Sequence, residues 1–297
     1  MGFELVGVPY TSMAARGGIA RAIEVMRSEG LADRLGTAGD VRDAGDLSLI
    51  EGDGVRGPSG FLNETALARL VVATREAVAS SHDRGRMPVL VGGDCPVMLG
   101  ALAAVRDRHG ACGLILVDGH EDAWPPSLSP TGEASDSEVG VALGLVGGAL
   151  PEPLGSLAPL LGPDAVAMLG PRDRAELEAA GVASLDGTVA GFRDDEAVRA
   201  HGPSDSAHDA VAAVAPAAPA FWLHIDLDVL RADELAAVDY PQPGGLTWPE
   251  LGDIGSAALA APGCAGASIV IYNPDRDPDR AGAKRIVGFA AGLVAAA

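Results

Sequence analysis

The stretch Leu114-Ile115-Leu116-Val117-Asp118-Gly119-His120-Glu121-Asp122 joins a short apolar run to a cluster of acids and one imidazole. An apolar run bounded by turn residues is typical of a β-strand that is buried on both faces. Alternate residues of an extended chain share a side, so Asp118, His120 and Asp122 are expected to point the same way. The stretch therefore predicts a buried strand with chemically active groups at its carboxyl end.

The same arrangement occurs twice more. Met87–Val91 precedes Gly92-Gly93-Asp94-Cys95-Pro96, and Phe221–Ile225 leads into His224-Ile225-Asp226-Leu227-Asp228. Alone, a Gly-Gly-Asp turn is often just a helix cap, and an acidic loop is often just solvated. Acids within an apolar strand, in contrast, are costly to bury without a partner. Together the clusters predict a site where carboxylates and imidazoles surround divalent cations.

The remaining chain alternates apolar runs with helical patterns. We predict strands at 3–8, 87–91, 114–117, 165–169, 221–225 and 267–272. We predict helices at 19–26, after the cap Asn63, after Gly92-Gly93-Asp94 to about residue 108, and at 172–180, 249–261 and 281–296. The ranges 36–60, 147–163 and 207–220 are expected to be loops or surface connections. Strands that are apolar on both faces and alternate with helices indicate an α/β domain with a parallel sheet. Such sheets carry their sites at the carboxyl ends of the strands.

Charge and composition exclude several classes of protein. The 297 residues include 21 Lys+Arg and 41 Asp+Glu, a formal net charge of −20. Binding a phosphate backbone needs a clustered positive surface, so we expect no nucleic-acid partner. Three cysteines are too few and odd in number for a disulfide framework, and no apolar run reaches the roughly 18 residues of a membrane helix. The chain also starts without the features of a signal peptide, so we expect a cytoplasmic protein with no membrane partner.

The three clusters resemble the metal motifs of the ureohydrolase superfamily, the arginase and agmatinase family. That family has a Gly-Gly-Asp-His, an Asp-Ala-His-x-Asp and a Ser-x-Asp-x-Asp motif, which match Gly92–Cys95, Asp118–Asp122 and His224–Asp228. The resemblance implies a single three-layer α/β/α domain over residues 1–297 with a mainly parallel sheet. It also implies a homo-oligomer that acts on a small-molecule substrate.

The activity that the resemblance implies is hydrolysis of linear C–N bonds other than peptide bonds, in an amidine, guanidine or amide compound. Two divalent ions, Mn²⁺ in the family, would hold a bridging hydroxide that attacks the substrate carbon. The implied metal ligands are Cys95, Asp118, His120, Asp122, Asp226 and Asp228. Asp118 and Asp226 would bridge the ions, and Asp122 would also carry a proton to the leaving amine.

Two departures concern the metals and the proton. Cys95 stands where the family has a histidine ligand. As a thiolate it would shift preference toward Zn²⁺ or Fe²⁺, and as a thiol it would leave that site weakened. Val139 stands where the family has a proton-shuttling histidine, and His224 replaces the serine of the third motif. His224 is therefore a candidate catalytic residue for proton transfer, or a hydrogen-bonded neighbour of the ligands.

Other departures concern the substrate. Ile271 replaces the glutamate that holds the guanidinium in arginases, and Ala175 replaces an acid that contacts the amino group, so plain L-arginine is not expected. The loop 129–138 offers replacement groups, with Glu133, Ser135 and Glu138 as candidate substrate-binding residues, although a solvated acidic loop would look the same. Trp124 and Trp248 lie near the motifs and either line the pocket or pack in the core.

Two other functions fit the same residues. A mononuclear zinc amidohydrolase resembling the deacetylases would need only Asp118, His120 and Asp226. A catalytically inactive protein that binds a ligand on this fold would account for Val139 and Ile271. The number of metal ions per chain distinguishes these alternatives.

Overall fold

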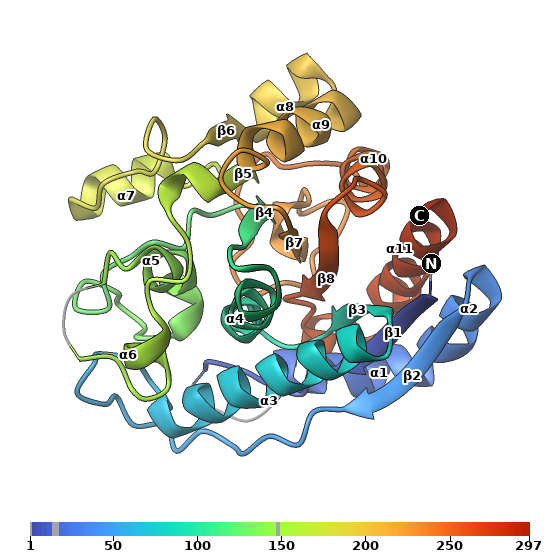
Figure 1. Ribbon diagram of the computed structural model, residues 1–297, viewed down its shortest axis with the longest axis horizontal. Coiled ribbons are helices and arrows are strands. Elements are labelled where there is room, and N and C mark those ends of the chain that lie inside the picture. Colours follow the sequence, from blue (N-terminus) through green and yellow to red (C-terminus); the bar gives the residue numbers. More distant parts are fainter. Residues whose placement is uncertain (1, 14–17, 147–148) are drawn as a thin grey trace.

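The computed structural model describes residues 2–13, 18–146 and 149–297, and within them eight strands form one sheet (Figure 1). The strands are β1 (Gly2–Gly7), β2 (Val41–Asp46), β3 (Arg86–Val91), β4 (Gly113–Val117), β5 (Val166–Gly170), β6 (Gly191–Asp194), β7 (Phe221–Asp226) and β8 (Cys264–Val270). Their order is β2-β1-β3-β8-β7-β4-β5-β6, and each neighbouring pair runs parallel. The predicted parallel α/β fold is confirmed.

Helices cover both faces of the sheet. They are α1 (Ala22–Ser28), α2 (Leu31–Ala38), α3 (Glu64–Asp83), α4 (Val97–His109), α5 (Glu138–Leu143), α6 (Leu154–Leu157), α7 (Arg174–Ala180), α8 (Asp195–His201), α9 (Pro203–Val214), α10 (Trp248–Leu259) and α11 (Ala281–Ala296). Contacts join α3, α4 and α5 in one group and α1, α2 and α8 to α11 in another. Figure 1 shows the sheet passing between α4 on one side and α10 and α11 on the other. This is a three-layer arrangement.

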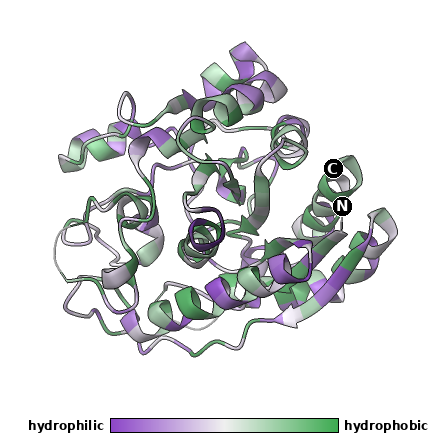
Figure 2. Cartoon of the chain, viewed as in Figure 1, coloured by the Kyte–Doolittle hydropathy of each residue, from purple (hydrophilic) through white to green (hydrophobic). Residues whose placement is uncertain are grey.

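The central strands are the most apolar part of the sheet. Every residue of β4 and β7 is buried, because helices cover both faces and other strands flank both edges. Figure 2 shows apolar residues along β8 and hydrophilic residues along the edge strand β2. Within the described residues, no helix is long and apolar enough to cross a membrane.

Two expectations for irregular segments were wrong. The range 36–60, expected as a loop, contains β2, whose sequence Val-Arg-Asp-Ala-Gly-Asp lacks an apolar run because it is an exposed edge strand. The range 207–220, expected as a surface connection, begins inside α9. Proline is favoured in the first turn of a helix and alanine within one, so Pro203 and the following alanines form a helix. Within the range 147–163, residues 147 and 148 lie outside the described residues, and α6 occupies part of the rest.

Asn63 precedes α3 as predicted, but its side chain does not cap the helix. Its Nδ2 donates to the carbonyl oxygens of Ser12 and Met13 at 3.0 and 2.9 Å, and its Oδ1 accepts from the Gly54 amide at 2.7 Å. Asn63 therefore ties two loops to the start of α3. The predicted apolar stripe of this helix is buried, as expected, at Leu67, Leu70, Val71 and Val78.

Helix α10 begins with a reciprocal cap that gives a test of the fold. Thr247 Oγ1 accepts from the Glu250 amide, and the Glu250 carboxylate accepts from the Thr247 amide at 2.7 Å. We expect Thr247→Ala to lower the free energy of unfolding by about 1 kcal/mol in chemical denaturation. Thr37→Ala removes an exposed threonine within α2 whose hydroxyl caps nothing, and it should leave stability unchanged or slightly higher. Equal losses in the two variants would contradict the capping role.

Candidate metal centre

Three strand ends place the predicted ligands at one edge of the sheet. Cys95 lies in the turn between β3 and α4, Asp118 follows β4, and Asp226 ends β7. The turn depends on glycine, because Gly93 has φ +74° and a Cβ there would lie 2.7 Å from the Val8 carbonyl oxygen. The close passage of this turn over β1 brings Cys95 to the ends of β4 and β7.

One group of donors contains Asp118, His120 and Asp228, whose candidate ligand atoms all lie within 4.8 Å of one another. His120 Nδ1 lies 3.0 Å from Asp228 Oδ2 and 3.7 Å from Asp118 Oδ1. Burial alone would lower the pKa of His120, but the two carboxylates raise it well above its usual value. The Gly119 amide donates to Asp228 Oδ1 at 3.1 Å, which fixes that carboxylate.

Asp226 connects this group to Cys95. The Cys95 Sγ donates to Asp226 Oδ2 at 2.8 Å, and the Asp228 amide donates to Asp226 Oδ1 at 2.7 Å. Burial and the nearby Asp228 raise the pKa of Asp226 well above its usual value. Burial and Asp226 likewise raise the pKa of the Cys95 thiol. The sulfur and this carboxylate can both be ionised at such a distance only with a cation beside them.

A second group of donors contains Cys95, Asp122 and Glu138. Glu138 begins α5 and is completely buried, and neither of its carboxylate oxygens has a hydrogen-bond partner within the described residues. Asp122 has φ +45°, a left-handed conformation that is uncommon outside glycine and is found at functional sites. Burial and Glu138 raise the pKa of Asp122 well above its usual value.

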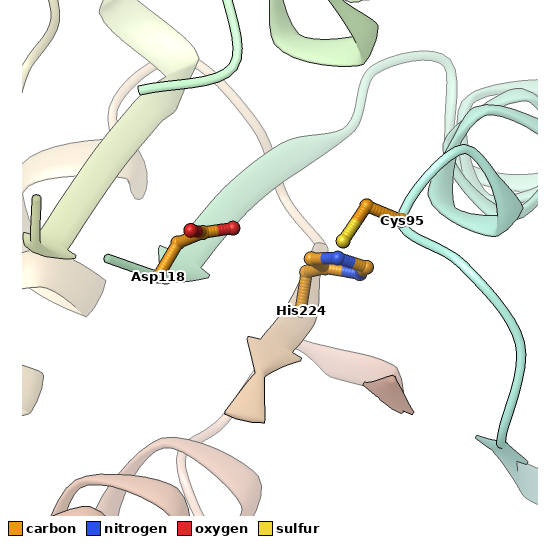
Figure 3. Close-up of side chains that lie close together, drawn as sticks. All are labelled: Cys95, Asp118 and His224. Carbon is orange, nitrogen blue, oxygen red and sulfur yellow. The ribbon is translucent and has the colours of Figure 1, made fainter. Parts of the chain in front are cut away.

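His224 lies beneath the pocket rather than on its wall. It is completely buried on β7, with Nδ1 2.6 Å from Ser268 Oγ of β8. Its Nε2 has no hydrogen-bond partner in the described part of the chain. Figure 3 shows the Cys95 sulfur above the imidazole and the Asp118 carboxylate facing both. Burial lowers the pKa of His224 to about 3, so the imidazole is neutral, which favours a role as a ligand over one as a proton donor.

The donor set fits divalent cations. Buried polar atoms normally have partners, yet the Asp118 Oδ2, the His224 Nε2 and both Glu138 oxygens have none among the described residues. Burial and Asp228 raise the pKa of Asp118 to about 6, which shows how poorly the protein alone stabilises its charge. Carboxylate, imidazole and thiolate donors in one buried cluster are the ligand types of transition metals and zinc.

A pocket of about 230 Å³ opens above these groups. Of the predicted substrate-binding residues, Glu133 and Ser135 line it, and Glu138 does not. Tyr240 donates its hydroxyl to Glu133 Oε2 at 3.1 Å, and burial with the nearby Asp94 raises the pKa of Glu133 to about 7. Glu138 lies beside Cys95 and Asp122, so the structure places it with the candidate metal ligands rather than on the pocket wall.

The remaining predicted positions divide between pocket and core. Trp124 lines the pocket, whereas Trp248 packs against Phe289 with ring centroids 5.5 Å apart. Ile271 lines the pocket with φ +67°, which is a strained conformation for a β-branched residue. Val139 is completely buried.

Two polar residues of the site, Tyr240 and Ser268, were not predicted from the sequence. Tyr240 follows no predicted strand, and no pattern in the sequence relates it to Glu133. Ser268 lies inside a predicted strand, where a single buried hydroxyl among apolar residues was the available signal. Its Oγ accepts from Trp222 Nε1 at 3.0 Å and contacts His224, so this serine orients two buried rings.

Together, the sheet and the buried acids define a parallel α/β protein whose chemistry lies at the carboxyl ends of its strands. A family model described as the arginase family matches residues 2–295, and the chain belongs to that family, within the ureohydrolase superfamily. The predicted resemblance is confirmed.

Individual relatives agree with this membership. The chain is 26% identical to the arginase of Bacillus caldovelox over 258 aligned residues. The alignment covers 83% of this chain and 82% of the relative. The solved native structure of the Bacillus caldovelox arginase matches with a TM-score of 0.84 and 25% identity, over 99% of this chain and 98% of that one. The formimidoylglutamase of Bacillus subtilis has the same fold, with a TM-score of 0.74 and 17% identity over 100% and 87% of the two chains.

The raised pKa values predict how the metal-free protein responds to pH. Asp118 and Glu133 have folded-state pKa values of about 6 and about 7, above their ordinary values of 3.8 and 4.5. Between pH 8 and pH 6 these two carboxyls take up protons in the folded protein and not in the unfolded chain, so their contribution to stability rises as the pH falls. His82, His120 and His224 contribute in the opposite direction, because their pKa values are shifted in the folded protein so that only the unfolded chain takes up these protons. We expect the stabilising contribution of Asp118 and Glu133 in the metal-free protein to be larger at pH 6 than at pH 8.

Thermal unfolding followed by circular dichroism measures the Tm at each pH. Two variants identify which groups cause its change with pH. Asp118→Asn removes one titrating group. From pH 8 to pH 6, its Tm should therefore rise less, or fall more, than the Tm of the parent. Asp164→Asn, at an exposed position, should show the same change in Tm as the parent. If the Tm of Asp118→Asn changes between pH 8 and pH 6 by as much as the Tm of the parent, the proposed contribution of Asp118 is wrong.

Proposed function

We propose that the chain is a binuclear metal-dependent hydrolase that cleaves a linear C–N bond in a cationic guanidino or amidino compound, within a single domain over residues 1–297. The observation that carries the proposal is the convergence of buried acids, His120 and Cys95 from three strand ends beneath an acidic pocket. Membership in the arginase family supports hydrolysis of C–N bonds.

Two ions are favoured over one because two of the three donor groups share no residue. Asp118, His120 and Asp228 make one group, and Cys95, Asp122 and Glu138 make the other. Asp226 lies between them, since it contacts Cys95 through one oxygen and the Asp228 amide through the other. A mononuclear zinc amidohydrolase would leave Asp122 and Glu138 buried without a partner ion, and such burial is unfavourable.

When bound, two divalent cations would lower the pKa of a water shared between them and stabilise the negative charge of the tetrahedral intermediate. The protein supplies the remaining steps. Asp122 lines the pocket and faces the same groups, so its carboxylate is placed to accept a proton and pass it to the leaving amine. Val139 cannot transfer a proton, which leaves this step to Asp122.

The pocket wall favours a cationic substrate. Among the described residues that line it, eight are Asp or Glu and none is Lys or Arg. Three of the eight, Asp122, Asp226 and Asp228, are proposed metal ligands, which leaves five acids outside the metal centre. An amidinium or guanidinium group would interact favourably with this field, whereas a free carboxylate would be repelled. Glu133, at the pocket wall beside Tyr240, is the proposed contact for the cationic group, with Ser135 beside it. The apolar side chain of Ile271 cannot hold a guanidinium, which supports a substrate other than L-arginine.

Other properties remain predictions. We propose a cytoplasmic homo-oligomer that binds a small-molecule substrate and neither nucleic acid nor membrane. The metals proposed are Mn²⁺ or, because of Cys95, Zn²⁺ or Fe²⁺.

Metal loading tests the proposal at Asp226. Elemental analysis of the purified protein should give about two ions per chain, as expected for a two-metal site. Asp226→Asn removes a charge shared by both groups and should lower metal affinity at least about 100-fold, since losing even an outer partner of a metal site costs about 10- to 100-fold. Asp253→Asn, exposed on α10, is the control and should bind as the parent does. A single ion per chain that survives Asp226→Asn would favour another kind of site.

Glu133→Gln tests the substrate class. In a screen of guanidino, amidino, formimino and acylamino compounds with each metal, we expect turnover of cationic members. The loss of the negative charge should raise KM for these compounds about 10-fold, which is the size of one hydrogen bond to a charged group, with little change in kcat. Glu178→Gln, exposed on α7 outside the pocket lining, serves as the matched control. Faster turnover of neutral acylamino compounds by the parent would overturn the cationic assignment.

A further inference from the structure

The Cys95 sulfur belongs to a third group of donors, formed with Asp118 and His224. The three candidate ligand atoms lie within 4.8 Å of one another, and all three residues are buried. Donors on one tetrahedral zinc ion lie about 3.5 Å apart, given metal–ligand distances of about 2.0 to 2.3 Å. The three ligand atoms therefore need to move only slightly closer together to bind one ion.

We propose that His224 supplies from strand β7 the imidazole ligand that the family carries at the position of Cys95, so that Cys95, His224 and Asp118 hold a zinc-type ion. This inference concerns the metal centre of the proposed function and deepens it by naming a ligand and a metal class. The chain departs from the family motifs at 95, where cysteine replaces histidine, and at 224, where histidine replaces serine. In this proposal the second change compensates for the first.

The surroundings of His224 are those of a metal ligand. A ligating histidine usually donates its other ring N–H to an oxygen, and Ser268 Oγ lies 2.6 Å from Nδ1. The same hydroxyl accepts from Trp222 Nε1, so the serine is held in place and has a second lone pair for the imidazole. With the proton on Nδ1, the lone pair of Nε2 is free to bind a metal, since Nε2 is buried without a hydrogen-bond partner among the described residues. Figure 3 shows the imidazole close to Cys95 and Asp118.

Charge and donor type select the metal. A thiolate and a carboxylate carry two negative charges and the neutral imidazole none, so His224 adds a ligand near Cys95 without adding to the negative charge that Asp122 and Glu138 already bring there. One sulfur, one nitrogen and one oxygen donor suit Zn²⁺ or Co²⁺ better than Mn²⁺, which prefers oxygen. The ion against Cys95 is therefore expected to differ in preference from the ion held by Asp118, His120 and Asp228 on its other side.

Cobalt substitution of the full-length protein tests the ligands without reference to turnover. The parent should show sulfur-to-cobalt charge-transfer absorption, which Cys95→Ser removes. His224→Ser should keep that absorption, shift the visible cobalt bands, and lower Zn²⁺ affinity about 100-fold while changing Mn²⁺ affinity less than about 10-fold, because a nitrogen donor matters less to Mn²⁺. The double variant Cys95→His with His224→Ser restores the family pair and should prefer Mn²⁺.

Two controls and two contrary outcomes complete the design. Cys112→Ser changes a buried thiol that donates to the Gly113 carbonyl oxygen at 3.2 Å, outside the three donor groups. His208→Ser changes an exposed imidazole, so neither variant should alter the cobalt spectrum. An unchanged cobalt spectrum and unchanged Zn²⁺ affinity in His224→Ser, or a parent without charge-transfer absorption, would overturn the inference. If the spectra change as expected while no compound in the screen is hydrolysed, the hydrolase proposal fails and this metal site stands.

Discussion

Carboxylates buried together at the end of a parallel sheet repel one another unless protons or cations lie among them. Asp118, Asp122 and Asp226 are held in that position by the buried strands β4 and β7 and the loops that follow them, and their pKa values are raised by burial and by neighbouring acids. The protein keeps this arrangement because helices cover both faces of the sheet and fix the strand ends. The left-handed backbone at Asp122 belongs to the same constraint.

The central part of the fold could be predicted because its strands are apolar on both faces. Strand β4 is an uninterrupted hydrophobic run, β7 is hydrophobic apart from His224 and Asp226, and helix α3 has a clear apolar stripe. The edge strand β2 lacks this signal, because solvent covers much of it and its residues are mostly polar. Helix α9 was missed because its alanines and neighbouring prolines look like a flexible connection, although alanine is the strongest helix former.

The part of the candidate site that lies at the strand ends could be predicted from the sequence. Residues that directly follow a parallel strand meet their counterparts at the same edge, so Asp118 and Asp226 could be paired from their positions alone. Glu138 could not be assigned in this way, because it reaches Cys95 only through the path of the loop between β4 and α5. Ser268 faces His224 because β7 and β8 pair in a register that places these two residues opposite each other.

Strand parity explains how a ligand can change its position in the chain without a change of fold. Residues 224 and 226 lie on the same side of β7, so an imidazole at 224 points to the same side of the sheet as the candidate ligand Asp226. The loss of an imidazole at 95 can therefore be compensated from a neighbouring strand. Among the described residues, Val139 and Ile271 have no comparable substitute. If the proposed function is right, the chain therefore differs from its relatives in substrate and proton chemistry more than in metal binding.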